Sequence, residues 1–513
     1  MSLSEAPPPH HEVPYPGGAY PETHPSHLYT LGRLLGLDTA HPRQCRYLEL
    51  GCGNGSNLWS MAELWPEAEF AGMDLSARQI AHGREVAEAA ELTNLSLVHA
   101  DILDYEPEGD FDYIVAHGVY AWVPGAVQER ILALVAKCLR PNGIAYVSYN
   151  ALPGCVFRKI NRDLAHFHAA AIHNPWDRMK QARAIVEFVS ESVPESSAMY
   201  RGVMAGETER LRSVTDDYLL HDDFAEFNTP LYFHEVVNQA AKHGLSYLGD
   251  AAFEDTQYVN VSETVKERLR PAGRLRYEQY LDFITGRAFR KTLLVHAHHD
   301  PSGGVVKSVV ESTSLRTRLK PASEAPDLRS TSPEKFNAPT GLVLSMTAPV
   351  AKAALVLLAA RGAGPTPFSV LVDLARAAAG SLAPRSEDAA ELADLLMDLY
   401  GGGAIELVGP HPAVATRVGA RPRAPRVARH LTRLGPGTVN LLHENIRIDE
   451  MFNRAVLSLV DGENDLHTIA EILRPAVVAG ALRFPADQTT LEAAVQNALA
   501  MLCGNGLLHA EEG

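Results

Sequence analysis

Residues 47–57, Y-L-E-L-G-C-G-N-G-S-N, constrain the fold of this chain more than any other segment. A short, largely apolar run carries an acid, Glu49, and leads into a turn with glycines at positions 51, 53 and 55. Glycine permits the positive φ of a tight turn and a close approach of the backbone to a ligand. The pattern therefore predicts a buried strand followed by a ligand-binding turn.

A dinucleotide-binding turn is the competing interpretation of these glycines. That fingerprint requires G-x-G-x-x-G, with the pyrophosphate close to the third glycine. Ser56 occupies the third position here, so the match fails where the pyrophosphate would bind. The strands on the C-terminal side of the turn decide between the two interpretations.

The next predicted strands end in acids. Strand 69–74 ends in Asp74, about 20 residues past the turn, where a carboxylate suits a ribose diol. The strand that begins at residue 95 ends in Asp101 and Ile102. A strand at 111–119, a helix at about 126–139 and a strand at 139–150 with a Pro-Asn-Gly turn complete the series.

This order of elements resembles the class I S-adenosylmethionine-dependent methyltransferases. In that family the glycine turn packs under the amino-acid end of the cofactor, and the acid before the turn helps to order that site. The acid after the third strand accepts from the adenine amino group, and its apolar neighbour covers the ring. The resemblance implies S-adenosyl-L-methionine as cofactor and S-adenosyl-L-homocysteine as product. The predicted cofactor-binding residues are Glu49, Gly51, Gly53, Asn54, Gly55, Asn57, Asp74, Leu75, Gln79, Asp101, Ile102, His117 and Gly118.

Composition limits the remaining function classes. The formal net charge of −16 argues against non-specific nucleic-acid binding, which relies on basic surfaces. The chain has no run of 18 apolar residues and no signal-peptide pattern at its start, so we expect no membrane span and a cytoplasmic location. Its five cysteines are scattered without a C-x-x-C pair, and we expect neither a disulfide framework nor a metal site.

At 513 residues the chain is long enough for two to four domains. The predicted fold is α/β: a Rossmann-like class I methyltransferase sheet with a helical insertion, followed by α-rich winged-helix-like C-terminal domains. A weak internal repeat of helix, short helix, helix and Gly turn predicts two such C-terminal domains. The predicted boundaries are an N-terminal arm with a cover helix over 1–40, the catalytic domain over 41–150 and 231–300, a helical lid over 151–230, a linker over 301–340, and winged-helix-like domains over 341–410 and 436–513.

The candidate catalytic residues lie after the fourth and fifth predicted strands. Methyl transfer is an in-line displacement, so positioning supplies much of the acceleration. An acceptor amine must arrive neutral, and an apolar channel lowers its pKa. Aromatic groups at these strand ends could line such a channel, although Tyr120 and Trp122 could instead be core residues under the insertion. The candidates are Tyr120, Trp122, Tyr149 and Asn150, with Tyr218 and His221 from an acid-rich segment at 216–234.

A narrower resemblance comes from further segments, among them H-G-V-Y-A-W-V-P, S-Y-N-A-L-P-G and R-A-F-R-K-T-L-L. They are similar to a bacterial family with a methyltransferase regulatory domain, which includes rickettsial protein lysine methyltransferases of outer-membrane proteins. Cys155 stands where that family has Trp, which puts the identity of the substrate in doubt. The resemblance implies N-methylation of lysine in a protein or peptide partner.

Two other functions stay open at this point. One is a small-molecule or natural-product methyltransferase that uses its C-terminal region to form a homodimer. The other is a regulator that senses S-adenosylmethionine and binds DNA through its winged helices. An arginine-rich stretch between the two repeat copies is the only basic feature in its favour, and the acidic net charge speaks against it.

Overall fold

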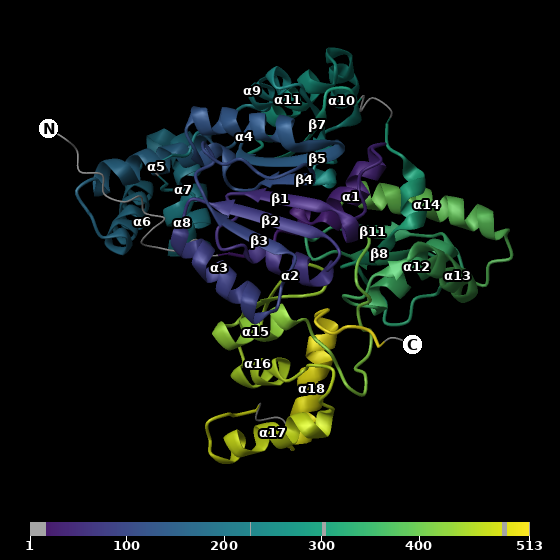
Figure 1. Cartoon of the computed structure of the whole chain (residues 1–513). Coiled ribbons are helices and arrows are strands. Elements are labelled where there is room, and N and C mark those ends of the chain that lie inside the picture. The colour runs from purple at the N-terminus through teal and green to yellow at the C-terminus, as the bar shows by residue number, and fades with distance from the viewer. Residues whose placement is uncertain (1–16, 226, 300–303, 485–489, 512–513) are drawn as a thin grey trace.

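The computed structural model describes residues 17–225, 227–299, 304–484 and 490–511. Figure 1 shows a central sheet with helices on both faces, a helical lobe at one side, and two further lobes formed by the C-terminal residues. The first 16 residues of the predicted N-terminal arm lie outside the described residues. The cover helix predicted near Ser26 is α1 (Pro25–Leu34).

The central sheet has seven strands in the order β3-β2-β1-β4-β5-β7-β6. Strands β1 to β5 are parallel to one another, and β7 is antiparallel to both β5 and β6. The carboxyl ends of the parallel strands therefore meet along one edge, which is where open α/β sheets bind their ligands. The strands are β1 (Arg46–Leu50), β2 (Glu69–Asp74), β3 (Leu95–His99), β4 (Phe111–Ala116), β5 (Leu139–Asn150), β6 (Leu245–Asp250) and β7 (Phe289–His296).

Side chains alternate between the two faces of this sheet. On one face Tyr47, Tyr146 and Leu293 belong to the same apolar core as α1, α2 (Ser56–Leu64) and α3 (Ala77–Ala89). Their neighbours Leu48, Val147 and Leu294 point to the other face. That face is covered by α4 (Gly125–Cys138) and α9 (Phe233–Lys242), with α11 (Arg274–Thr285) beside α9. Figure 1 shows the sheet between these two helical layers.

A helical lobe is inserted between β5 and α9. It has a small apolar core of its own, which includes Met179, Val186, Met204 and Leu219. The lobe occupies the residues predicted to form a helical lid, at the carboxyl edge of the sheet (Figure 1). Its helices are α5 (Val156–Ala169), α6 (Pro175–Ser192), α7 (Ala198–Arg212) and α8 (Asp216–His221).

The first C-terminal lobe is built on the three-stranded sheet β12-β8-β13 and three helices. Its apolar core is continuous with the core under α1, and the rings of Phe253 and Tyr400 stack across the junction with centroids 5.0 Å apart. The elements are β8 (Ser314–Thr317), α12 (Pro349–Ala360), β12 (Thr366–Pro367), α13 (Phe368–Ala379), α14 (Arg385–Gly401) and β13 (Ile405–Val408).

Residues 301–340 were predicted to be a linker, and the described part of this segment, 304–340, differs from that expectation. Besides β8 they contain β9 (Lys320–Pro321) and β10 (Glu334–Asn337), which pair in a small antiparallel sheet with β11 (Val343–Met346). Phe336 is fully buried there, and Lys352 Nζ donates to the backbone oxygens of Asp327, Ser330 and Ser332. The Pro-rich composition suggested an exposed crossing, but these long-range contacts order the segment.

The second C-terminal lobe is attached to α2 and α3. Both carboxylate oxygens of Glu63, at the end of α2, accept from backbone N–H groups of Arg426 and Val427 at the start of α15. Val427 is buried against Trp59 and Val86. Figure 1 shows α15 directly against these helices. The lobe contains α15 (Arg426–Leu434), β14 (Gly437–Val439), β15 (Asn445–Arg447), α16 (Met451–Ser458), α17 (Leu466–Val478) and α18 (Leu491–Gly504).

The predicted fold class is confirmed by this architecture: a Rossmann-like methyltransferase sheet carries a helical insertion and α-rich C-terminal lobes. The strand order places β7 between β5 and β6. Within the described residues, no helix combines the length and apolar character needed to cross a bilayer. The exact domain boundaries stay a prediction.

Candidate active site

The glycine turn between β1 and α2 adopts the backbone conformation that its sequence requires. Gly51, Gly53 and Gly55 have φ of +72°, +57° and +78°, a region that L-residues with side chains rarely occupy. A Cβ on Gly51 would lie 2.5 Å from Val119 Cγ2, whereas a Cβ on Gly53 would meet no atom within 4 Å. The turn is therefore closed underneath and open above Gly53, where a ligand can approach the backbone.

Glu49 is an acid buried beneath this turn. Its side chain is almost inaccessible, and Asn57 Nδ2 lies 3.2 and 3.3 Å from the two carboxylate oxygens. Burial, with the nearby Asp74 charge, raises the pKa of Glu49 to about 8, although the bond from Asn57 opposes this. Glu49 forms no ion pair among the described residues. A buried acid without a cation suits a ligand that brings a positive charge, such as the amino-acid end of S-adenosylmethionine.

Asp74, at the end of β2, holds the turn in place. Its Oδ2 accepts from Gly53 N–H and its Oδ1 from Ser76 N–H, both at 2.8 Å. A carboxylate has about four lone-pair sites, so holding the turn is compatible with accepting from a ribose diol. Leu75 is the next residue, with 51 % of its surface exposed, and Gln79 is buried in the first turn of α3.

The end of β3 supplies an acid and an apolar side chain, as predicted. Asp101 is exposed, and its Oδ1 accepts from Leu103 N–H at 2.9 Å. Ile102 is buried against the core on the α4 face. The exposed side chains of Leu75 and Leu103 flank these positions. Apolar surface beside an acceptor suits a flat base with an amino group, so this end of the site fits adenine.

His117 and Gly118 come directly after β4 at the same edge. His117 Nδ1 lies 3.0 Å from the Tyr146 hydroxyl and 3.3 Å from Ser148 Oγ, and Gly118 N–H donates to Ser148 Oγ. Burial lowers the pKa of His117 to about 4, so the imidazole is neutral at pH 7. A Cβ on Gly118 would meet no atom within 4 Å, which leaves a second open position facing the site.

The thirteen predicted cofactor residues therefore lie together at the carboxyl ends of four adjacent strands, β3, β2, β1 and β4. The open space above Gly53 and Gly118, the buried acid and the exposed apolar patch fit the three parts of S-adenosylmethionine.

Tyr149 and Tyr120 differ from the predicted acceptor role. Both are fully buried: the Tyr149 hydroxyl lies 3.1 Å from Thr292 Oγ1, and the Tyr120 hydroxyl donates to Gln239 Oε1 at 2.7 Å. The alternation of β5 explains this, because it turns Ser148 toward His117 and Tyr149 toward the core under α4 and α9. The two tyrosines are core residues and do not face the site.

The other predicted acceptor residues lie near the junction of β5 and the helical lobe. Asn150 is buried, and its Nδ2 donates to Asn228 Oδ1 at 3.0 Å, while Asn228 donates to the backbone oxygen of Asp222. Tyr218 bonds to the Asp222 side chain, and His221 is buried at the end of α8. Trp122 is half-buried against the α4 core. Their roles in catalysis stay a prediction.

Sequence reasoning missed several side chains that border this site. The ring of Tyr20, in the segment before α1, lies 4.0 Å from the His117 ring, and its N–H donates to Asn57 Oδ1. Glu22 pairs with Lys291 of β7. The cover therefore comes from residues 17–24, while α1 itself packs into the core below the sheet. The Pro- and Gly-rich composition of the arm indicated an extended segment but not which residue would meet the site.

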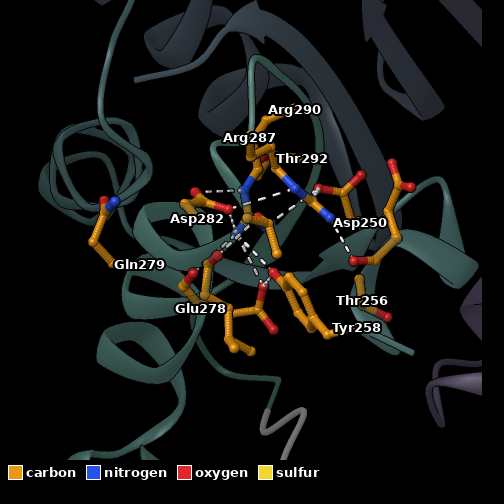
Figure 2. A network of polar contacts seen from close by, with 12 residues as sticks. Asp250, Thr256, Tyr258, Glu278, Gln279, Asp282, Arg287, Arg290 and Thr292 are labelled. Carbon is orange, nitrogen blue, oxygen red and sulfur yellow. Dashed lines mark hydrogen bonds and ion pairs between the residues drawn. The ribbon is translucent and has the colours of Figure 1, made fainter. Parts of the chain in front are cut away.

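A buried ionic cluster lies behind β7, as Figure 2 shows. Arg290 is fully buried and contacts three carboxylates: Asp282 at 2.8 Å, Glu278 at 3.0 Å and Asp250 at 3.3 Å. Arg287 pairs with Asp250 and Asp282 as well. The cluster joins β6, β7 and α11. The turn at 151–155 is bonded to it, because Gly154 N–H donates to the backbone oxygen of Arg287.

Comparison with known proteins agrees with this geometry. A family model described as a methyltransferase domain matches residues 48–143, a predicted methyltransferase regulatory domain matches 215–296, and the C-terminal winged helix domain of PKMT matches 420–511. The uncharacterized protein RP789 of Rickettsia prowazekii is 33% identical over 94% of this chain and 89% of its own length.

Among solved structures, PKMT2 from Rickettsia typhi is similar with a TM-score of 0.86 and 28% identity, covering 96% of this chain and 100% of that one. The same protein has been solved in complex with AdoHcy, with the same degree of similarity. Trans-aconitate 2-methyltransferase from Acidovorax sp. (strain JS42) is 32% identical over only 21% of this chain and 39% of its own.

Proposed function

The chain belongs to the class I S-adenosylmethionine-dependent methyltransferases with a methyltransferase regulatory domain, and we propose that it methylates lysine side chains of a protein or peptide. The observation that carries this proposal is the full-length similarity to PKMT2, which extends through the helical insertion and both C-terminal lobes. A small acceptor requires none of these additional regions.

The chemistry of the site supports an amine acceptor. S-adenosylmethionine supplies an electrophilic methyl group on its sulfonium sulfur. His117 is bonded at Nδ1 and has a pKa of about 4, so it is a weak base at pH 7. An acceptor that needs a strong base would react slowly here, whereas a neutral amine brings its own lone pair. A free lysine has a pKa of about 10.4 and must lose a proton before it reacts.

Aromatic rings border the place where the amine would approach. The rings of Tyr20 and Phe289 both lie near His117, with centroids 4.0 and 6.5 Å from the imidazole. Aromatic faces attract an alkylammonium, and apolar surroundings then favour its neutral form. The role we propose for these three residues is to guide the lysine stem and to position its nitrogen, since positioning supplies much of the acceleration in displacement reactions.

One observation favours a different acceptor, a small carboxylate. Arg158, Lys159 and Arg162 line a cavity beside Asn150, and a trans-aconitate 2-methyltransferase is similar to 21% of this chain. However, this cavity has a volume of about 10 Å³, which is room for about one water molecule. Lys159 is also paired with Asp163. The carboxylate function is therefore the second candidate.

The experiment that separates the two is transfer of labelled methyl from S-adenosylmethionine. Lysate of the source cell is split into a protein and a small-molecule fraction, and purified enzyme is added to each. We expect label in protein, mapped by mass spectrometry to lysine and abolished when the lysine amines are acetylated beforehand. Label that enters only the small-molecule fraction would overturn the lysine proposal. An Asp74→Ala variant, run in parallel, controls for other methyltransferases in the lysate.

A further inference from the structure

The turn between β14 and β15, together with the first residue of β15 (residues 440–445), reaches from the second C-terminal lobe to the helix that begins at the cofactor site. His443 is 1 % exposed and has φ of +60°. Its Nε2 lies 2.9 Å from Asn57 Oδ1 and its Nδ1 lies 2.8 Å from Ser60 Oγ, across 386 residues of sequence in the first case. Both partners are on α2, the helix that begins at the end of the glycine turn.

The direction of these hydrogen bonds can be assigned from the backbone. Tyr20 N–H can only donate, so the Asn57 atom 2.9 Å from it is the carbonyl oxygen. His443 Nε2 contacts the same oxygen and therefore carries the hydrogen, while Nδ1 accepts from the Ser60 hydroxyl. Burial lowers the pKa of His443 to about 3, consistent with one neutral tautomer. The Asn57 amide group then faces Glu49 and Thr23, to which it donates.

The same turn also holds the N-terminal arm. Asn445 Oδ1 accepts from Ala19 N–H at 2.9 Å, and Asn445 Nδ2 donates to Ala19 O at 2.8 Å. Ala19 is followed by Tyr20, whose ring packs on His117. The far end of the arm is fixed by Thr23, whose backbone oxygen accepts from the Tyr47 hydroxyl at 3.1 Å. Residues 19–23 are therefore secured at one end by the sheet and at the other by the C-terminal lobe.

We propose that residues 440–445 of the C-terminal winged-helix domain are part of the cofactor site: His443 is a positioning residue for Asn57 and Glu49, and Asn445 fastens the arm that carries Tyr20. The affinity for S-adenosylmethionine then depends on the docking of a domain that contributes no residue of the glycine turn. This inference rests on the cofactor site and is independent of the identity of the acceptor.

The physical reason is the placement of a single amide. The Asn57 side chain bonds to Glu49, Thr23, Tyr20 and His443, so the loss of one partner frees the amide to rotate. Rotation would turn the carbonyl oxygen toward Glu49, where two acceptors repel once cofactor binding has ionised the acid. It would also release Tyr20 N–H. The removal of His443 thus disturbs both the buried acid and the arm.

The test uses the full-length chain and three substitutions. His443→Ala removes both hydrogen bonds to α2, and Asn445→Ala removes the two hydrogen bonds to the backbone of Ala19. Arg447→Ala, on the same hairpin, is the matched control. Arg447 is exposed, and its guanidinium pairs with the exposed Asp449. Affinity for S-adenosylhomocysteine is measured by calorimetry, and exchange of the Ala19 and Tyr20 amide hydrogens is measured in the cofactor-free chain.

We expect His443→Ala to weaken cofactor binding about tenfold or more, the scale of a lost buried hydrogen bond. Asn445→Ala should do so more weakly, and both should accelerate exchange at residues 19 and 20. With saturating cofactor, turnover should fall less than affinity. Arg447→Ala should match the wild type in all measurements.

A folded His443→Ala variant with wild-type affinity and wild-type exchange at residues 19 and 20 would overturn the proposal. If that variant fails to fold, Asn445→Ala decides, because the hydrogen bonds of the Asn445 side chain go to the arm. Unchanged affinity and exchange in Asn445→Ala would then have the same meaning. The affinity and exchange measurements use no methyl acceptor, so a failure of the lysine proposal leaves these two measurements intact.

Discussion

Two groups of buried acids in this molecule have opposite surroundings. Asp250, Glu278 and Asp282 face Arg287 and Arg290, so that their charges are nearly balanced within the protein (Figure 2). Glu49 is equally buried, but among the described residues its hydrogen-bond partner is an amide, that of Asn57, and its pKa is raised to about 8. A cluster of buried acids that is paired with arginines of the same chain stabilises the fold. A buried acid without a cation suits a positively charged ligand, and this is the role we propose for Glu49.

Removing Arg290 from its cluster of buried carboxylates should produce the largest change in stability. Arg290→Met leaves three buried carboxylates with Arg287 alone, and removing one partner from a buried ionic group costs about 3–5 kcal/mol. We expect a loss of that size in the free energy of unfolding, measured by urea denaturation. Arg318→Ala, which removes the two ion pairs of a 70% exposed arginine with Glu406 and Glu444, is the matched control and should change stability little. If both variants had the same stability, the Arg290 cluster would not be the stabilising group we describe.

Neutralising Glu49 should weaken cofactor binding without lowering the stability of the cofactor-free fold. Glu49→Gln should bind S-adenosylhomocysteine about tenfold or more weakly, since a charge-assisted bond is lost. The folded pKa of about 8 lies above the usual value of 4.5, so ionised Glu49 destabilises the cofactor-free fold as pH rises from about 4.5 to 8. Glu49→Gln should therefore be at least as stable as the wild type at pH 8.5, opposite in sign to Arg290→Met.

The same acid predicts a proton release on cofactor binding. Pairing with an ammonium requires the carboxylate form, so wild-type affinity should increase from pH 6 to pH 8 as Glu49 ionises. Calorimetry at pH 7 in two buffers of different ionisation enthalpy measures the protons released. We expect more protons from the wild type than from Glu49→Gln. Equal release from both would remove Glu49 from the ammonium site.

The second acid to substitute is Asp74, which accepts hydrogen bonds from the backbone N–H groups of Gly53 and Ser76. Asp74→Ala should weaken cofactor binding by about 1–3 kcal/mol, because it removes bonds to the ribose and to Gly53 N–H. Glu88→Ala, on the exposed surface of α3, is the control. Calorimetry with S-adenosylhomocysteine measures both, and unchanged affinity in a folded Asp74→Ala variant would disprove the ribose assignment.

Tyr149→Phe should have the smallest effect. The substitution removes one hydroxyl bonded to Thr292 in the core, at a cost of about 0.5–1.5 kcal/mol of stability. Turnover at saturating cofactor should stay close to that of the wild type, measured with the labelled-methyl assay. A large loss of turnover without a loss of stability would return Tyr149 to the acceptor site.

The sequence predicted the cofactor half of the site because its residues lie close to one another along the chain. Each of Glu49, Asp74 and Asp101 lies in or just after the last residues of a strand, and parallel strands bring their carboxyl ends to one edge. The strand that carries Tyr149 was predictable, but the face of the sheet to which its side chain points was not. The role of each face depends on which helices cover it. His443 had no sequence signal at all, since its partners are hundreds of residues away and a histidine in a hairpin turn has many ordinary roles.

The continuous core that joins the catalytic sheet to the first C-terminal lobe restricts how this enzyme can be divided. Phe253 stacks on Tyr400, and a Cβ at Gly409 would collide with the backbone oxygen of Ser26 on α1. A fragment cut near residue 335 would leave the lower face of the sheet in water and would aggregate or unfold. Truncated forms, fusions and recombinant hybrids therefore have to keep residues 17 to about 410 together in order to fold, and the proposed role of residues 440–445 adds the second C-terminal lobe for full cofactor affinity.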